Sequence, residues 1–173
     1  RYTVKVEPQP DELTSDNNEA AFWVNVSENR ISVFYAEGVP RWEYKFLSQT
    51  LRQDPNVEFT GSVRTAGETF TLQGVRKTMR LVGGLPASEK DFEGFDVIIL
   101  GDLPRSLMPE AQMEIIEKMV LDGGSLIVVA GSQILDPSYA RSKLAAMLPV
   151  RTGGAVQKFS ASFVPQPTDA GRN

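Results

Sequence analysis

The side chains that could do chemistry in this chain are serine, tyrosine, lysine and the carboxylates, because its 173 residues include no cysteine and no histidine. The missing cysteine excludes thiolate nucleophiles and thiolate metal ligands. The missing histidine excludes the side chain that most readily exchanges a proton near neutral pH. Catalysis would therefore need an unusually activated serine or a pair of carboxylates.

Three apolar runs end in a glycine beside a polar side chain: Glu37-Gly38, Gly101-Asp102 and Gly131-Ser132. Ligands of open α/β sheets bind beyond the carboxyl ends of the strands, so we predict ligand-binding residues here. Arg41 follows the first pair near a helix start and could hold an anion. Glu37 and Asp102 could instead bind a hard cation with water. In a purely structural alternative, the glycines make tight turns and Asp102 closes a loop.

Ser132 is a weak candidate nucleophile, because it follows a buried strand as the serine of a nucleophile elbow does. Only part of the G-x-S-x-G pattern is present, and the base would have to be Lys143 or Lys158. Neither a Walker A sequence nor a G-x-G-x-x-G fingerprint after the first strand occurs. The sequence therefore predicts no cofactor and no resident metal.

From residue 30 onward, apolar runs alternate with amphipathic segments. This pattern predicts an α/β domain with a doubly wound, mostly parallel, flavodoxin-like sheet over residues 30–173. We expect strands at 31–35, 57–63, 95–100 and 126–130, a possible strand at 159–164, and helices at 41–52, 109–121 and 138–148. In the first helix the expected buried stripe is Trp42, Phe46, Leu47 and Leu51.

Residues 64–94 have no clean period, which predicts a functional lid or an insertion with short strands of its own, such as 69–72. Ser88 resembles a helix N-cap, with Asp91 three residues later. The segment 1–28 differs, because Tyr2, Val4 and Val6 alternate with polar residues. It predicts a β-hairpin with one buried face, either the end of a preceding β-sandwich or an edge hairpin on the following domain.

Composition limits the class of partner. There are 18 basic and 22 acidic residues and a net charge of −4, which gives no support for nucleic-acid binding. No apolar run approaches the ~20 residues that span a bilayer. Because the chain begins at Arg1 in strand-like sequence, we expect it to be a piece of a longer protein.

Three segments resemble one family: RISVFYAEGVPRWEYKFLSQTL at 30–51, FDVIILGDLP at 95–104 and DGGSLIVVAGSQ at 122–133. They are similar to the class I glutamine amidotransferase-like domain of large bacterial membrane proteins that also carry von Willebrand factor A domains. The hairpin with Asp16-Asn17-Asn18 is similar to the end of the immunoglobulin-like module that precedes that domain.

The resemblance implies an extracytoplasmic, periplasmic domain that is truncated at its C-terminus and tethered by membrane helices outside this chain. Its partners would be other domains of the same polypeptide or envelope proteins. True class I amidotransferases have a catalytic cysteine at a strand-to-helix elbow, which corresponds here to 129–132, where no cysteine stands. Their His and Glu would lie near or beyond Asn173.

From these features we expect a non-catalytic module that binds a ligand or interacts with other proteins. The absence of cysteine and histidine favours a protein that is not an enzyme over one that is. One alternative is a hydrolase-type enzyme that uses carboxylates or a metal at Glu37 and Asp102. Another is a structural spacer between the sandwich and the membrane.

Overall fold

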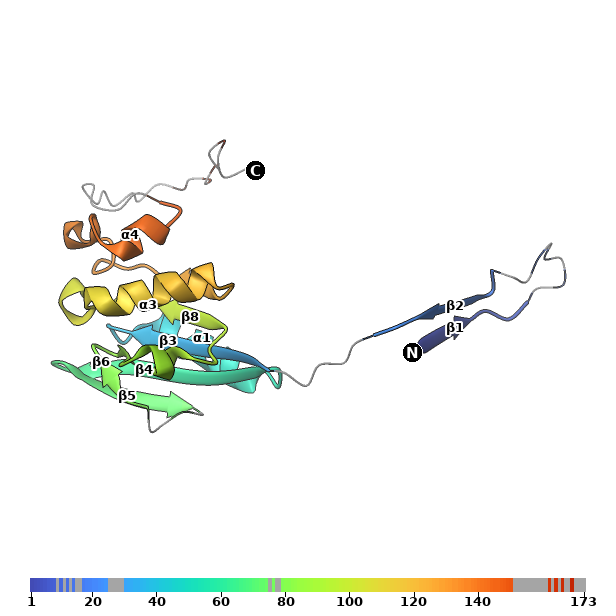
Figure 1. Ribbon diagram of the computed structural model, residues 1–173, viewed down its shortest axis with the longest axis horizontal. Coiled ribbons are helices and arrows are strands. Elements are labelled where there is room, and N and C mark those ends of the chain that lie inside the picture. The colour runs from blue at the N-terminus through green and yellow to red at the C-terminus, as the bar shows by residue number, and fades with distance from the viewer. Residues whose placement is uncertain are drawn as a thin grey trace.

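A five-stranded, mostly parallel sheet forms the centre of the molecule (Figure 1). The computed structural model describes residues 1–8, 10, 12, 14, 17–24, 30–74, 76, 79–150, 162, 164, 166 and 169. The strand order is β5-β4-β3-β8-β9, and every pair except β4–β5 is parallel. The strands are β3 (Ile31–Glu37), β4 (Val57–Ala66), β5 (Thr69–Gly74), β8 (Val97–Leu100) and β9 (Ser125–Val128). The α/β class predicted from the sequence is confirmed.

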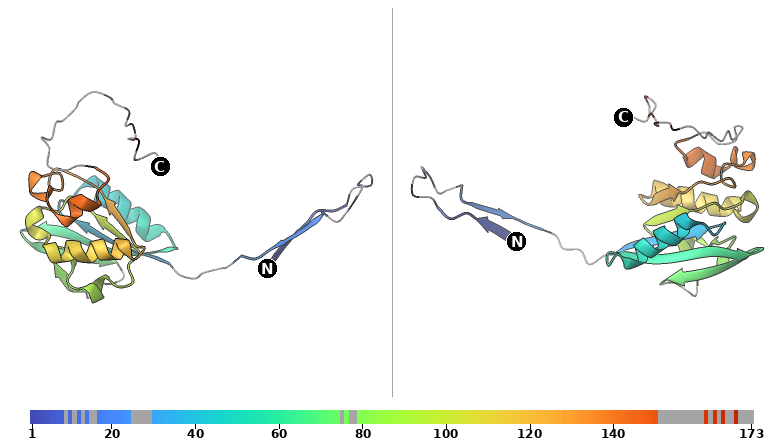
Figure 2. Two further views of the ribbon diagram at one scale, coloured as in Figure 1. Left: turned by 45° about the horizontal axis from the view of Figure 1, so that its top comes forward. Right: turned by 180° about the vertical axis from the view of Figure 1, so that it is seen from behind.

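Helices cover both faces of this sheet. On one face α1 (Trp42–Gln53) packs its Tyr44, Leu47 and Leu51 against β3 and β4. On the other face lie α3 (Glu110–Leu121) and α4 (Lys143–Met147), which contact each other. Figure 1 shows α3 and α4 on the near side, and the right-hand view of Figure 2 shows α1 in front. This arrangement places the carboxyl ends of β3, β8 and β9 side by side.

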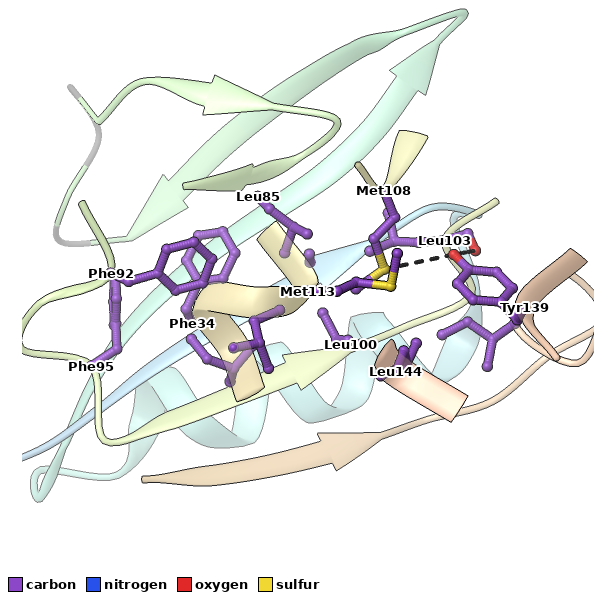
Figure 3. Packing of buried hydrophobic residues seen from close by; sticks show 14 residues of the cluster. Phe34, Leu85, Phe92, Phe95, Leu100, Leu103, Met108, Met113, Tyr139 and Leu144 are labelled. Carbon is purple, nitrogen blue, oxygen red and sulfur yellow. Dashed lines mark hydrogen bonds between the residues drawn. The ribbon is translucent and has the colours of Figure 1, made fainter. Parts of the chain in front are cut away.

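The larger core lies between the sheet and α3 (Figure 3). Phe34 from β3 packs its ring 5.3 Å from that of Phe95, and Leu100 from β8 is fully buried. Tyr139 belongs to the short 3₁₀ helix Pro137–Tyr139 and donates a 2.9 Å hydrogen bond from its hydroxyl to the carbonyl of Leu103. Because a buried hydroxyl needs a partner, this bond determines how the chain after β9 packs on the core.

The buried stripe predicted for α1 is wrong at two of its four positions. Trp42 and Phe46 are 67% and 59% exposed, and their rings stack on each other at 5.8 Å on the outer face of the helix. The buried positions are instead Tyr44 and Ser48. Tyr44, Leu47, Ser48 and Leu51 have the i, i+3, i+4, i+7 spacing of one helix face, so the helix is rotated relative to the expectation.

The single helix predicted over 138–148 is also wrong. The chain forms one 3₁₀ turn at Pro137–Tyr139 and then begins again as α4. Asp136 caps the first turn, because its carboxylate accepts from the backbone N of Ser138. Ser142 caps the second turn, because its Oγ accepts from the backbone N of Ala145 at 3.3 Å. Two N-caps six residues apart explain why one continuous helix does not form.

Residues 64–94 form an insertion with secondary structure of its own. β5 extends β4 as an antiparallel edge, and β6 (Leu81–Val82) pairs with β7 (Leu85–Pro86). A short helix, α2 (Glu89–Phe92), follows, and Ser88 caps it by accepting from Asp91 N at 3.4 Å. The predicted insertion and the predicted cap at Ser88 are both confirmed. The 3₁₀ helix Arg105–Leu107 lies between β8 and α3.

The N-terminal hairpin consists of β1 (Tyr2–Lys5) and β2 (Glu19–Phe22), which pair antiparallel with Tyr2 opposite Phe22. Every residue of both strands is exposed, so neither face of the hairpin is buried among the described residues. Residues 25–29, which connect the hairpin to β3, lie outside the described residues. Of the possible strand at 159–164 only Ser162 and Val164 are described, and both are exposed and outside any strand. In the described part of the chain, no helix is long and apolar enough to cross a membrane.

A buried serine in β4 gives a stability prediction. Ser62 is fully buried between Ala36 of β3 and Leu72 of β5, and its Oγ has no hydrogen-bond partner among the described residues. Because an unpaired buried hydroxyl is unfavourable, Ser62→Ala should raise the free energy of unfolding by about 1 kcal/mol. Urea denaturation measures the change. Ser142→Ala is the matched control, since it removes a buried serine that caps a helix, and it should lower stability by about 1 kcal/mol. A loss of stability in Ser62→Ala would contradict the prediction.

Candidate functional site

The predicted site residues come together at one edge of the sheet. Glu37 ends β3, Asp102 lies two residues after the end of β8, and Gly131 lies three residues after the end of β9. Since these three strands are parallel neighbours, their carboxyl ends meet, as the sequence suggested. We call Glu37, Arg41 and Asp102 with the three glycines Gly38, Gly101 and Gly131 the strand-end cluster.

Glu37 is the centre of the strand-end cluster. Its side chain is fully buried, and each carboxylate oxygen accepts two hydrogen bonds. Oε1 accepts from the backbone N of Val39 at 3.2 Å and of Asp102 at 2.8 Å. Oε2 accepts from the Tyr35 hydroxyl at 3.2 Å and from Arg41 Nη2 at 3.0 Å. A buried carboxylate is tolerated only with such compensation, so Glu37 is already fully partnered within the protein.

Arg41 connects β3 to the chain beyond β9. Its Nη2 also donates to the carbonyl of Val129 at 2.8 Å, and its Nη1 donates to that of Ala130 at 3.3 Å. The side chain is 17% exposed, and Nε has no partner among the described residues. Burial would lower the pKa of Arg41, but the hydrogen bond and charge of Glu37 outweigh it, and the pKa is raised. Arg41 therefore stays charged and binds three acceptors of the protein.

Asp102 holds the segment that follows β9. Its Oδ1 accepts from the backbone N of Gln133 at 2.8 Å and of Ile134 at 3.0 Å, and the residue is 4% exposed. The carboxylate thus serves two backbone donors of the turn that contains Ser132. This is the loop-closing role that the sequence left open for Asp102.

The glycines of the cluster allow the carboxylates to approach the backbone. A Cβ on Gly101 would lie 2.6 Å from Glu37 Oε1, and one on Gly131 would lie 2.8 Å from Asp102 Oδ1. A Cβ on Gly38 would lie 2.6 Å from Cα of Leu103. Real Cβ atoms essentially never lie so close to another atom, so something would have to shift at each position. At Gly38 it would be the backbone, and at Gly101 and Gly131 it would be the carboxylates of Glu37 and Asp102. The sequence prediction that these glycines permit close approach agrees with this geometry.

Ser132 is exposed at the same end of the sheet, and no base is provided for it by Lys143. The Nζ of Lys143 binds Glu117 at 3.0 Å, and this hydrogen bond raises the pKa of Lys143. A higher pKa makes an amine less able to accept a proton at neutral pH. Lys158, the other candidate base, lies outside the described residues.

The alternative of a carboxylate or metal hydrolase requires Glu37 and Asp102 to face a substrate or ion. The two residues are adjacent, but both carboxylate oxygens of Glu37 and Oδ1 of Asp102 accept hydrogen bonds from the protein's own donors. A cation at Glu37 would have to displace two backbone amides, a tyrosine hydroxyl or an arginine. Among the described residues, no group of three or more acidic side chains is placed to hold a metal ion.

Two contributors to the cluster were missed by sequence reasoning. Tyr35 donates to Glu37, and the carbonyls of Val129 and Ala130 accept from Arg41. Tyr35 could have been found, because residues i and i+2 of a strand lie on the same side. The carbonyl acceptors could not, because nothing in a sequence marks which backbone oxygen a distant side chain will reach.

A pocket of about 370 Å³ lies at the opposite edge of the sheet, at the amino ends of β8 and β9. Phe95, Ile115 and Met119 are among its lining residues, with acidic side chains such as Asp96 and Asp122. It shares no residue with the strand-end cluster, so it is a separate feature of the molecule.

Three buried tyrosines predict a loss of stability at alkaline pH. Burial, and after it the charge of Glu37, raises the pKa of Tyr35, and burial also raises the pKa of Tyr44 and of Tyr139. Above about pH 10 the unfolded chain ionises these tyrosines while the folded protein keeps them neutral. The folded state then binds more protons, so stability should fall with rising pH by about 1.4 kcal/mol per pH unit for each tyrosine.

Urea denaturation between pH 8 and 11, with phenolate absorbance recorded in parallel, measures this fall. Tyr139→Phe should make the free energy of unfolding fall less steeply with pH, because it removes the contribution of Tyr139 and leaves that of Tyr35. A free energy of unfolding that is constant between pH 9 and 11 would contradict the prediction.

Comparisons of this chain with protein-family models, with curated proteins and with solved structures found no match.

Proposed function

We propose that this chain is a non-catalytic module that acts by contacting other domains or proteins, with the amidotransferase-like, flavodoxin-like fold that its sequence resembles. The single observation that carries this proposal is that the charged groups of the cluster bind the protein itself. Glu37 binds Arg41 and the backbone N of Asp102. The Asp102 carboxylate binds the backbone of Gln133 and Ile134. An enzyme of this architecture needs free polar groups at the carboxyl ends of its strands. Here those groups hold the strand ends together.

The residues of the elbow support the same proposal. Where a class I amidotransferase has its cysteine, residues 129–132 read Val-Ala-Gly-Ser. Two of these residues, Val129 and Ala130, contribute carbonyls that bind Arg41. A nucleophile at this position would need an oxyanion site and a base, and the nearby charges are already engaged in structural hydrogen bonds.

The apolar side chains that the protein exposes support a role in contacts. Trp42 and Phe46 stack on the surface of α1, and Lys45 Nζ lies 4.7 Å from the Trp42 ring. Trp23, beside the hairpin, is 81% exposed. Large exposed aromatic groups are typical of surfaces that contact other proteins. The partners proposed are other domains of the same polypeptide or envelope proteins, in a periplasmic setting.

The N-terminal hairpin fits this proposal as the last part of an immunoglobulin-like module. Its strands expose Tyr2, Val4 and Phe22, and a two-stranded hairpin alone is marginally stable in water. The further strands of a sandwich would cover these side chains. The hairpin would then connect that module to the α/β domain.

Glutamine hydrolysis tests the non-catalytic proposal directly. We expect the purified chain to release no ammonia from glutamine above the buffer rate. If release is seen, Ser132→Ala distinguishes its source, and Ser138→Ala is the matched control because Ser138 is also an exposed serine. Turnover that is abolished by Ser132→Ala and retained in Ser138→Ala would refute the proposal.

A further inference from the structure

A pocket of about 480 Å³ lies beside α1, between this helix and β5. In the right-hand view of Figure 2, α1 lies in front of the sheet. The pocket shares no residue with the strand-end cluster, so it is a separate feature of the molecule. One lining residue belongs to β5 and the others to α1: Gln73, and then Tyr44, Lys45, Ser48, Gln49, Arg52 and Gln53.

The lining of this pocket has two cations and no acidic side chain. Lys45 and Arg52 lie in it beside uncharged side chains that can form hydrogen bonds. Neither cation forms an ion pair with an acidic side chain in the part of the chain that the structure describes. The protein as a whole has a net charge of −4, so the pocket has the opposite sign of charge. Because interfaces pair opposite charges, the pocket favours an anionic partner.

Neutral groups orient Arg52. Its Nη2 donates to Oε1 of Gln73, and its guanidinium carbon lies 5.3 Å from the centre of the Phe59 ring. The same oxygen of Gln73 accepts from the Tyr44 hydroxyl at 3.5 Å. Gly61 makes room for that hydroxyl, because a Cβ there would lie 2.6 Å from it. None of these partners is an anion, so the charge of Arg52 is left for a carboxylate from outside the described residues.

Two exposed aromatic rings lie beside the pocket on the same helix. Trp42 and Phe46 are 67% and 59% exposed, and their rings stack at 5.8 Å. The Nζ of Lys45 lies 4.7 Å from the Trp42 ring and 5.9 Å from the Phe46 ring, so this lysine connects the aromatic pair to the pocket. Tryptophan and arginine are enriched among the residues that contribute most to binding at protein interfaces. A partner that fits both parts has an apolar side chain next to carboxylates.

We propose that this surface of α1, formed by Trp42, Lys45, Phe46 and Arg52, binds an acidic peptide segment of another domain or protein. One apolar side chain of the segment packs on the two aromatic rings, and its carboxylates pair with Lys45 and Arg52. The glutamines of the pocket supply hydrogen bonds to the backbone of the segment. Such binding presupposes the contact role proposed above and specifies the chemistry of the partner.

Titration of the full chain with a synthetic peptide tests the proposal. The probe is a short acetylated peptide of aspartate and glutamate with one central leucine. The chain has two tryptophans, so a Trp23→Phe background leaves the fluorescence of Trp42 as the readout. We expect saturable binding with a Kd below about 1 mM. The affinity should fall as salt is raised, because exposed charges are screened.

Charge variants locate the binding site. Lys45→Gln/Arg52→Gln should weaken peptide binding at least about tenfold, because it removes both cations of the pocket. Lys90→Gln/Arg141→Gln is the matched control, since it removes two exposed cations that do not line the pocket, and it should leave the affinity unchanged. The absence of saturable binding, or equal weakening in both double variants, would overturn the proposal.

Two further probes distinguish other occupants of the surface. Inorganic phosphate that displaces the peptide at equal concentration would overturn the proposal in favour of a small-anion site. Phosphatidylglycerol vesicles that bind where the peptide does not would overturn it in favour of a membrane surface. A chain that neither binds the peptide nor releases ammonia from glutamine would contradict the acidic partner alone and leave the non-catalytic proposal standing.

Discussion

Arg41→Met is expected to lower the free energy of unfolding by about 3 kcal/mol, because removal of one partner leaves a buried charge uncompensated. Glu37 is fully buried, and Arg41 is the cation that its carboxylate binds at 3.0 Å. The variant also loses the donors to the carbonyls of Val129 and Ala130. Chemical denaturation of wild type and variant measures the difference.

A double-mutant cycle separates the ion pair from the other contacts of Arg41. Glu37→Gln alone should lower the free energy of unfolding by about 2 kcal/mol. The double variant Arg41→Met/Glu37→Gln should be destabilised by less than the sum of the two single variants, and the difference should be at least about 1 kcal/mol. Lys118→Met is the control, because Lys118 and Glu89 form an exposed pair whose loss should cost far less than the loss of Arg41. Additive losses in the cycle would show that the buried pair is not coupled, and a loss in Lys118→Met as large as that in Arg41→Met would contradict the role of burial.

Gly38→Ala is expected to destabilise the protein by about 3 kcal/mol, the upper end for an inserted methyl group. Its Cβ would lie 2.6 Å from Leu103 Cα and 2.9 Å from the carbonyl carbon of Asp102. Both neighbours are backbone atoms, so β3 and the chain after β8 would have to move apart. That movement would also stretch the hydrogen bond between Asp102 N and Glu37. Thermal and urea unfolding measure the effect.

Gly67→Ala is the matched control for this substitution. Gly67 has a φ of +54°, and a Cβ there would meet nothing within 4 Å. Only the conformational strain of the left-handed region remains, which amounts to about 1 kcal/mol. A loss in Gly38→Ala no larger than that in Gly67→Ala would contradict the close packing of the strand ends.

The strand-end cluster was predictable because it depends on strand order and chain direction. Glu37, Asp102 and Gly131 each follow an apolar run of strand length, and parallel strands bring such positions to one edge. The chemical role of these residues was not predictable in the same way. A carboxylate that binds a ligand and one that binds a neighbouring backbone amide have the same sequence signature, and only distances such as the 2.8 Å from Asp102 N to Glu37 separate them.

The orientation of α1 illustrates why a hydrophobic pattern can mislead. Sequence reasoning assigned the largest apolar residues, Trp42 and Phe46, to the buried face. The structure buries Tyr44 and Ser48 instead, and the Tyr44 ring packs 4.9 Å from that of Tyr35. Arg41, at the start of this helix, binds Glu37 and the carbonyl of Val129. These contacts fix the rotation of the helix, and they depend on residues distant in the sequence, which local periodicity does not include.

The chain after β9 was predicted less well for a similar reason. Asp136 followed by Pro137 predicts a helix start, and this local signal is correct. The helix ends after one turn because Tyr139 is buried and bonds to Leu103. Ser142 then begins the next helix. A tertiary contact thus overrides the local preference for a continuous helix.

Amide hydrogen exchange at the carboxyl ends of the strands tests most directly whether the cluster's charges are held within the protein. Four backbone amides donate to its two carboxylates: Val39 and Asp102 to Glu37, and Gln133 and Ile134 to Asp102. We predict that the opening which exposes each of these amides to exchange has a free energy above about 3 kcal/mol, although all four lie in loops. Arg41→Met should accelerate the exchange of the amides of Val39 and Asp102. Exchange of the four amides at the rate of exposed loops, unchanged in Arg41→Met, would contradict this account and leave Glu37 and Asp102 available to a ligand.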